Sequence, residues 1–395
     1  MKRPACEVAD VFRRYGRDFL AERELALTTI QRRVMAAILF CRTAALGGQV
    51  EQCDRCGHRR FFYRSCRNRH CPKCQWAARA AWLSDRVAEL LPCQYFHIVF
   101  TLPAPLRALV LQNRKLLLAM LFRAASASLR EIAADPKHLG AGIGLLAVLH
   151  TWGQQLQFHP HLHCVLPGGG LSPDQQRWIA CRPGFFLPVR VLSRRFRSLY
   201  LGQLEAAFLR GELTLQGPLA ALAEPPAFQR WLRALRQREW VVYAKPPFDG
   251  PARVLAYLAR YTHRVAIANH RLVSIEQGRV RFQWRDYRHH NKRKCASLAA
   301  GEFIRRFLMH VLPQGFRRIR YYGFLAAPCR QRLALCRRLL AVPEPIQAPK
   351  PTARALYEKL TGRSLRDCPA CGRGAMLVID AWPTQVSLRA PPDTS

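Results

Sequence analysis

Histidines occupy alternate positions of the segment HPHLH at 159–163, which runs into an apolar stretch and three glycines. Because the side chains of a β-strand alternate between its two faces, His161 and His163 point the same way and could share one metal ion. A histidine on an apolar strand is more often a core residue, but two on one face before a glycine run favour a metal site. A hard divalent ion, Mg²⁺ or Mn²⁺, would polarise a phosphate there. A third ligand is expected, and Gln154 is the first choice, followed by Gln157.

A pair of tyrosines, Tyr257 and Tyr261, is spaced so that both hydroxyls share one face of a helix. A phenolate that attacks a phosphodiester forms a 5′-phosphotyrosine and frees a 3′-hydroxyl, and it conserves the bond energy for rejoining. With two tyrosines, one can hold a donor strand while the other attacks a second strand. Alone, such a pair would be interpreted as helix packing. Beside a metal-binding histidine pair it indicates phosphodiester chemistry, and it does not suit peptide or sugar chemistry.

Two CxxC pairs, Cys53/Cys56 and Cys71/Cys74, are separated by fourteen residues. Each pair can place two thiolates at the corners of a tetrahedron, so the spacing predicts a structural zinc ion with these four ligands. Three residues inside the intervening loop could replace one ligand: His58, Cys66 and His70.

A third CxxC pair, Cys368/Cys371, lies near the end of the chain. One pair cannot close a tetrahedral site. The candidates for completing it, Cys329 and Cys336, are distant in the sequence, so metal binding by this pair is left open.

The chain is strongly basic: 63 Lys and Arg against 25 Asp and Glu give a formal net charge of +38. Such a surface repels itself unless it meets a polyanion, ordinarily nucleic acid and otherwise an anionic membrane. The loop RRFFYRSCRNRH at 59–70 alternates aromatic residues with Arg, which suits base stacking and phosphate pairing, although a solvated basic loop would look similar. The predicted DNA contacts are Arg67, Arg69, Arg260, Arg264, Arg285, Lys292 and Arg293.

Neither a signal peptide nor an apolar run of the roughly 18 residues needed to span a bilayer is visible. We therefore expect no membrane association and a cytoplasmic, nucleoid-associated protein in a bacterium. In a reducing compartment, the fifteen cysteines indicate thiols and metal ligands and do not indicate a disulfide framework.

Strands and helices must position these side chains. The apolar spacing predicts helix over 8–46, a core strand over 94–102 and two neighbouring strands over 145–151 and 157–166, joined near Gly153. Glycines 168–170 predict a turn. Asp249-Gly250-Pro251 is a typical start for the helix that carries the tyrosines. Helices over 193–239 and a strand over 279–284 follow the same patterns.

Four regions result: a helical and zinc-binding module (1–91), a nuclease and transferase core with a helical insertion near 193–239 (92–275), a basic C-terminal part of that core (276–345) and a Pro-rich tail that we expect to be loose (346–395).

These motifs together resemble the two-tyrosine HUH transposases of rolling-circle insertion sequences, the IS91 type and its common-region relatives. The resemblance covers most of the chain and is carried by CDRCGHRRFFYRSCRNRHCPKCQ, HIVFTLP, WGQQLQFHPHLHCVLPGGGL, YLARYTHRVAIANHRL and EFIRRFLMHVLPQGFRRIRYYGFLA. It implies an α+β fold in which an antiparallel sheet flanked by helices forms the HUH core. His161 and His163 match the metal histidines, and Tyr257 and Tyr261 match the tyrosine pair.

The resemblance implies cleavage and joining of single-stranded or hairpin DNA at element ends, followed by transfer to target DNA. The chain has no GxxxxGK[ST] loop, so strand displacement would use a host helicase. A plasmid replication initiator or relaxase would use the same chemistry, and a non-catalytic zinc-dependent nucleic-acid-binding protein is the alternative from another class. The order of attack by the two tyrosines and the oligomeric state are left open.

Overall fold

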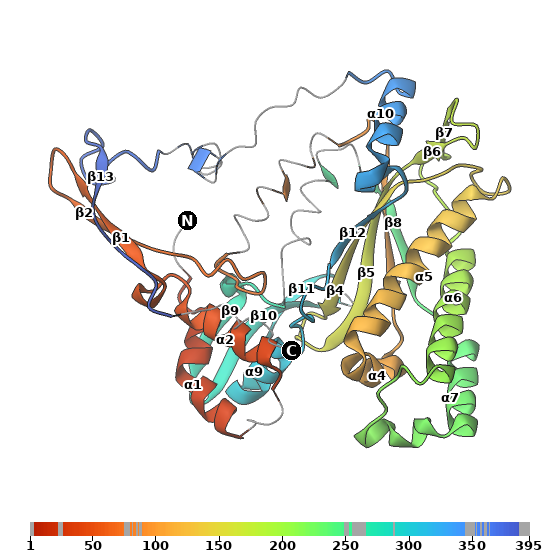
Figure 1. The fold of residues 1–395 in the computed structure, drawn as a ribbon, viewed down its shortest axis with the longest axis horizontal. Coiled ribbons are helices and arrows are strands. Elements are labelled where there is room, and N and C mark those ends of the chain that lie inside the picture. Colours follow the sequence, from red (N-terminus) through yellow and green to blue (C-terminus); the bar gives the residue numbers. More distant parts are fainter. Residues whose placement is uncertain are drawn as a thin grey trace.

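The computed structural model describes most of the chain, namely residues 4–22, 27–74, 80, 82–83, 86, 89–248, 253–254, 266–286, 289–343, 352, 354–355, 358, 362 and 364–386. The fold is mixed α+β, with antiparallel sheets and helices as expected (Figure 1). Within the described residues, no helix combines the length and the apolar character that crossing a membrane requires.

A five-stranded antiparallel sheet forms the centre of the molecule, with strand order β12-β4-β5-β3-β8. Its strands are β3 (Tyr95–Thr101), β4 (Leu145–Trp152), β5 (Phe158–Pro167), β8 (Val242–Phe248) and β12 (Ile319–Tyr322). The three strands expected over 94–102, 145–151 and 157–166 are therefore present and adjacent. β8 is an edge strand, and there the missing N–H groups of Pro246 and Pro247 do not interrupt the sheet.

Helices cover one face of this sheet (Figure 1): α4 (Arg107–Gln112), α5 (Arg114–Ala134), α6 (Val189–Leu209) and α7 (Pro225–Gln237). Alternate residues of the central strands are buried beneath them, including Phe96, Ile98 and Phe100 of β3 and Leu162, Cys164 and Leu166 of β5. Burying each such side chain stabilises the fold by about 2 kcal/mol. The residues between them, His97, Val99, His161 and His163 among them, face the opposite side of the sheet.

A second core joins distant parts of the sequence. Helices α1 (Val8–Glu22), α2 (Thr29–Phe40) and α9 (Ala300–Leu308) pack on the sheet of β9 (Leu272–Glu276), β10 (Arg279–Asp286) and β11 (Lys292–Ala299). The single helix expected over 8–46 is in fact two helices. Thr28 explains the second start, because its side chain and that of Gln31 form a capping box at α2.

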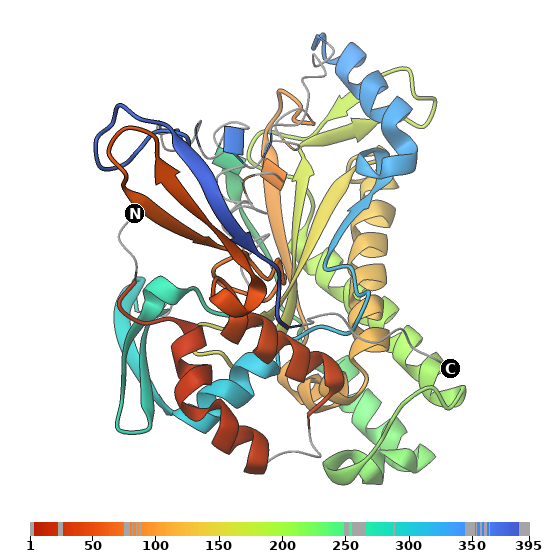
Figure 2. The ribbon, with the colours of Figure 1, turned by 60° about the vertical axis from the view of Figure 1, so that its left-hand side comes forward.

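A third sheet projects from the rest of the molecule and pairs an early segment of the chain with a late one (Figure 2). Its strands are β13 (Met376–Trp382), β1 (Gly48–Cys53) and β2 (Arg59–Tyr63), in that order and antiparallel. The tail expected to be loose therefore supplies a strand. Proline-rich composition describes residues 343–351 but not the segment after them, which finds its partner in a strand more than three hundred residues earlier.

Two smaller elements complete the described fold: the β6 (Gly169–Leu171) and β7 (Trp178–Ala180) hairpin, and helix α10 (Arg330–Leu339). The turn predicted at glycines 168–170 is wrong, since Gly169 and Gly170 belong to β6. A Cβ at Gly169 would lie 2.6 Å from the Ile179 carbonyl oxygen and 2.7 Å from the Trp178 ring. These glycines permit close strand contact and do not reverse the chain.

Candidate active site and metal centres

Three histidines converge on the face of the central sheet that α5 and α6 leave uncovered. His161 and His163 alternate along β5 as predicted, and His150 on β4 pairs directly with His161. One ring nitrogen from each of the three lies within 4.8 Å of the others. This set of convergent imidazoles fits a single metal ion.

The structure differs from the expectation of Gln154 as the third ligand and brings His150 to the pair instead. The side-chain oxygen of Gln154 accepts a hydrogen bond from the backbone N–H of Arg285 at 3.3 Å, and its carbonyl accepts one from Arg271 at 2.6 Å. Gln154 lies in the turn after β4 and faces the neighbouring sheet. The predicted hairpin near Gly153 brings the strand of His150 beside β5, but the sequence does not give the register that sets His150 opposite His161.

Hydrogen bonds from a second layer orient the imidazoles. Nδ1 of His161 donates to the backbone carbonyl of His159 at 2.6 Å, which leaves Nε2 as the ligand atom. Nδ1 of His163 is hydrogen-bonded to Nε2 of His97 at 2.8 Å, and the planes of the two rings are nearly parallel, 4° apart. His97 lies on β3, and no sequence pattern pointed to it.

Burial keeps these imidazoles neutral. It lowers the pKa of His161 to about 4 and that of His97 to about 3, and it lowers the pKa of His163 well below its usual value. The charge of Lys245 contributes to the lowering at His97 and His163. Neutral imidazole is the form that binds metals, so no proton has to leave His161 or His163 before an ion binds at neutral pH.

Lys245 and Tyr243 flank the histidines from the edge strand. Lys245 pairs with His97, and Tyr243 pairs with Val99, which in turn pairs with His163. Directly paired residues share a face of a sheet, so both side chains lie on the histidine face. Lys245 is partly buried, and burial lowers its pKa. It places a positive charge on the same face of the sheet as the three histidines.

The predicted nucleophiles Tyr257 and Tyr261, together with Arg260 and Arg264, lie outside the described residues. Val254, three residues before Tyr257, is described and is fully buried. It packs in one cluster with Val148 and Val165. Val148 pairs directly with His163, and Val165 lies two residues after it, so Val254 covers the histidine face of the sheet.

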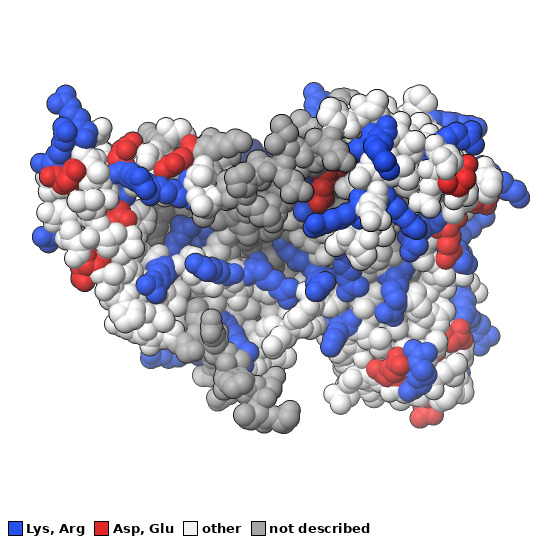
Figure 3. All heavy atoms as spheres, turned by 45° about the horizontal axis from the view of Figure 1, so that its top comes forward, with Lys and Arg blue, Asp and Glu red and all other residues white. Residues whose placement is uncertain are grey.

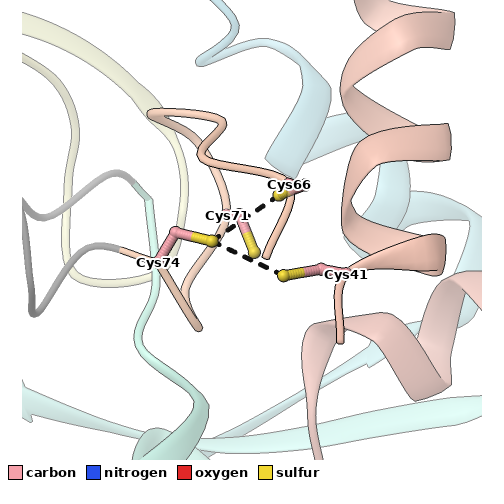
Figure 4. Close-up of side chains that lie close together, drawn as sticks. All are labelled: Cys41, Cys66, Cys71 and Cys74. Carbon is pink, nitrogen blue, oxygen red and sulfur yellow. Dashed lines mark hydrogen bonds between the residues drawn. The ribbon is translucent and has the colours of Figure 1, made fainter. Parts of the chain in front are cut away.

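The cysteines form two clusters, and the structure divides the four expected zinc ligands between them. Cys71 and Cys74 join Cys66 of the same loop and Cys41, which caps the C-terminus of α2 (Figure 4). The sulfur of Cys74 lies 3.5 Å from that of Cys41 and 3.6 Å from that of Cys66. Four thiols at these separations fit a tetrahedral zinc ion.

The close approach of the four thiols shifts their pKa values in opposite directions. Interaction with Cys66 lowers the pKa of Cys41 to about 7, and interaction with Cys41 lowers the pKa of Cys74. The same interactions with Cys41 raise the pKa of Cys66 and Cys71. Four thiolates this close together would repel one another, and a bound cation would balance their charge.

The other expected pair, Cys53 and Cys56, meets Cys368 and Cys371 from the end of the chain. The single four-cysteine cluster predicted from Cys53, Cys56, Cys71 and Cys74 is thus replaced by two clusters. The reason is the β1–β2 hairpin: Cys53 ends β1, a strand of six residues that spans about 20 Å. The loop between the two CxxC pairs returns along this hairpin, which separates them.

Several of the predicted DNA contacts are exposed. Arg67, Arg285, Lys292 and Arg293 are accessible to solvent. Arg285 on β10 lies directly opposite Arg293 on β11. Figure 3 shows Lys and Arg side chains in a band across one face of the molecule, with few acidic side chains along it.

Arg69 is exposed as well, but its guanidinium is engaged by the protein itself. Its guanidinium donates to the backbone carbonyls of Phe316 at 2.6 Å and Pro313 at 3.1 Å. It therefore fastens the cysteine loop to the segment before β12.

Comparisons with known proteins agree with this architecture. A family model described as "Putative transposase" matches residues 144–332, and a second, described as "Transposase zinc-binding domain", matches residues 11–102. No solved structure shows a significant match.

Two curated relatives cover nearly the whole chain. "Putative transposase y4qJ" of Sinorhizobium fredii (strain NBRC 101917 / NGR234) is 62% identical over 387 residues, which are 97% of this chain and 97% of the relative. "Transposase for insertion sequence element IS801" of Pseudomonas savastanoi pv. phaseolicola is 31% identical over 357 residues, 88% of this chain and 83% of the relative. The chain thus belongs to the IS91/IS801 family of insertion-sequence transposases.

Proposed function

We propose that this transposase nicks and joins single-stranded DNA at the ends of its element through 5′-phosphotyrosine intermediates. Tyr257 and Tyr261 are the proposed nucleophiles, and His150, His161 and His163 the proposed ligands of a divalent ion. The observation that carries the proposal is the convergence of three imidazoles, two buried and one partly buried, on one face of the central sheet.

The path of the chain supports the tyrosine assignment. Val254 packs on the histidine face, and three residues of extended chain span at most about 11 Å. The chain between Val254 and Tyr257 is therefore long enough for Tyr257 to reach the face on which the imidazoles lie. We propose that the helix with Tyr257 and Tyr261 presents at least one hydroxyl to a phosphate held there.

The proposed reaction balances without another cofactor. The phenol oxygen forms a bond to phosphorus, and the bond from phosphorus to the 3′-oxygen breaks. The phenol loses a proton, and the leaving 3′-oxygen gains one and becomes a hydroxyl. Rejoining is the reverse attack by a 3′-hydroxyl. A bound divalent ion would supply Lewis-acid polarisation of the phosphate. Of the two ions expected, Mn²⁺ suits three imidazoles better, because Mg²⁺ prefers oxygen ligands.

Residues of the chain would do the remaining work at the phosphate. His97 and the His159 carbonyl hold the imidazoles of His163 and His161 in their orientations. Lys245 adds a positive charge on the same face, where it would stabilise the negative charge that develops on the phosphate oxygens.

The function is tested by incubating the purified protein with Mn²⁺ and a labelled single-stranded oligonucleotide that carries an element end. We expect one strand to be cut and the 5′ end of the product to remain attached to protein through denaturing electrophoresis, with EDTA preventing both. Strong binding without a cut would favour a non-catalytic zinc-dependent binding protein. Cutting at a plasmid origin in preference to an element end would favour a replication initiator or relaxase.

The same proposal includes the partners. We propose that the protein acts in the bacterial cytoplasm on single-stranded or hairpin ends and on target DNA, with strand separation by a host helicase. The excess of Lys and Arg gives a surface suited to a polyanion.

The exposed face of β10 and β11 is the proposed strand-binding surface outside the active site. Arg285 and Arg293 face each other across the two strands, and like charges in this arrangement destabilise a sheet unless an anion lies between them. Replacing both by Gln should weaken single-strand binding. The slope of log K against log salt should fall by about 1.4, which is about 0.7 for each phosphate that the protein no longer neutralises.

Fluorescence anisotropy at several salt concentrations measures this slope. The matched control is Arg190→Gln with Arg194→Gln, which removes the same charge from exposed positions on α6. An equal change of slope in both variants would show that only net charge matters and that β10 and β11 do not contact the strand.

A further inference from the structure

Four thiols from opposite ends of the chain meet at the tip of the projecting sheet. We propose that Cys53, Cys56, Cys368 and Cys371 hold a second structural zinc ion, which joins the two ends of the transposase. Cys368 and Cys371 lie outside both family matches, which end at residues 102 and 332. The second site is therefore a property of this chain's fold beyond its zinc-binding domain.

The two halves of the site repeat one local structure. Both read CxxCG, and both glycines, Gly57 and Gly372, have left-handed φ angles, of 69° and 65°. In each half the glycine N–H donates to the carbonyl of the first cysteine, Cys53 at 3.2 Å and Cys368 at 2.9 Å. Each half is therefore a tight knuckle of the kind that presents two thiolates to one ion.

Backbone N–H groups point at the sulfurs within these knuckles. The N–H groups of Arg55 and Cys56 donate to the sulfur of Cys53 at 3.4 and 3.5 Å, and that of Ala370 donates to the sulfur of Cys368 at 3.4 Å. Such bonds stabilise a thiolate, which is the form that binds zinc.

The spacing between the knuckles matches a tetrahedral ion. The sulfurs of Cys53 and Cys371 are 3.7 Å apart, and those of Cys56 and Cys368 are 3.6 Å apart. Ligands on a regular tetrahedron with Zn–S bonds of about 2.3 Å are about 3.8 Å apart. The four ligand atoms all lie within 4.8 Å of one another.

The projecting sheet has little else to hold it together. Its buried cluster consists of Cys53, Cys368 and Met376, with Cys371 packed against them. The middle residues of β13 are exposed. A sheet of three short strands without an apolar core is not stable by itself, and small modules of this kind depend on a metal. Zinc would take the place of the core.

The segment after the C-terminal knuckle packs tightly against the β1–β2 hairpin. Gly374 faces the sulfur of Cys53 so closely that a Cβ would collide with it. Asp54 accepts a hydrogen bond from the N–H of Ala375 at 2.9 Å and donates its own N–H to the Ala375 carbonyl at 3.1 Å. These contacts fix the register in which the C-terminal knuckle meets the hairpin.

The test is the zinc content of the purified full-length protein, measured by atomic emission together with the protein concentration. We expect about two zinc ions per chain, one for each tetrahedral cysteine cluster. Replacing both Cys368 and Cys371 by Ser should remove one of them, and replacing Cys41 and Cys74 by Ser should remove the other. Cys295→Ser with Cys329→Ser, outside both clusters, should keep both.

Limited proteolysis gives a second readout that does not depend on activity. We expect Cys368→Ser with Cys371→Ser to expose the segment around β13 to cleavage at least tenfold faster, while the Cys295 and Cys329 variant is cut at the original rate. One zinc ion in the unaltered protein, or two in the Cys368 and Cys371 variant, would overturn the proposal.

Discussion

Replacing both Tyr257 and Tyr261 by Phe is expected to abolish the covalent protein–DNA product, with a loss on the order of 10⁴-fold or more, as for other enzymes that lose their nucleophile. The substitution removes two hydroxyl oxygens and leaves the rings for packing. Binding of single-stranded DNA should change by less than about threefold, because the basic surface supplies most of the affinity. Denaturing electrophoresis of the labelled strand measures the first quantity and anisotropy the second.

Tyr243 provides a matched control for this result. It is an exposed tyrosine on the same sheet face as the histidines, so Tyr243→Phe removes a nearby hydroxyl without touching the proposed pair. This variant should retain the covalent product. If the pair of Phe substitutions left the product intact while Tyr243→Phe removed it, the nucleophile would have been assigned to the wrong segment.

Replacing His161 and His163 together by Ala is the second large effect. It removes two of three ligands, so the metal would no longer polarise the phosphate. We expect the variant to lose several kcal/mol of transition-state stabilisation, which would slow cleavage by about 10³-fold. Single-turnover cleavage in Mn²⁺ measures the change, and calorimetric titration with Mn²⁺ should show that the ion no longer binds.

Because His163 is buried and hydrogen-bonded to His97, the folded state must be checked by thermal melting of the variant. His138→Ala, at an exposed histidine after α5, serves as the control and should cleave normally. A folded His161 and His163 variant that cleaves at the rate of the original protein would exclude these imidazoles from the reaction.

The alternation of side chains along a strand is a local property, and it correctly predicted that His161 and His163 lie on one face. The residues that join them from other strands could not be predicted from the sequence of a single strand. His150 and His97 join the site from neighbouring strands, and their places depend on the register of β4 and β3 against β5. Pairing register is set by turns and by the packing of whole strands, so a pattern within one strand does not contain it.

The cysteines illustrate the same limit. The spacing of two residues predicts each knuckle, because a knuckle is a single turn of chain. Which two knuckles share an ion depends on tertiary structure, and here Cys53 and Cys56 pair with residues more than three hundred positions away. Cys41 carries no motif at all, since its role follows from the end of α2 lying against the loop of Cys71 and Cys74.

Composition misled at the C-terminus for a related reason. The prolines after about residue 340 suggested a loose tail, yet β13 forms along β1. The strand itself, MLVIDAW, is apolar and β-branched, but its Leu377, Val378 and Ile379 side chains are exposed, so their burial does not drive its pairing. Its pairing is favoured by backbone hydrogen bonds and by the knuckle that precedes it.

The most direct test of the proposed chemistry is to locate the DNA on the protein. After incubation with Mn²⁺ and an element-end oligonucleotide, the protein would be digested with nuclease and protease, and the peptides that carry a nucleotide would be sequenced by mass spectrometry. We predict a phosphotyrosine link at Tyr257 or Tyr261 and at no other residue. Cleaved DNA with no peptide attached, or a nucleotide on a different side chain such as Tyr243, would contradict it.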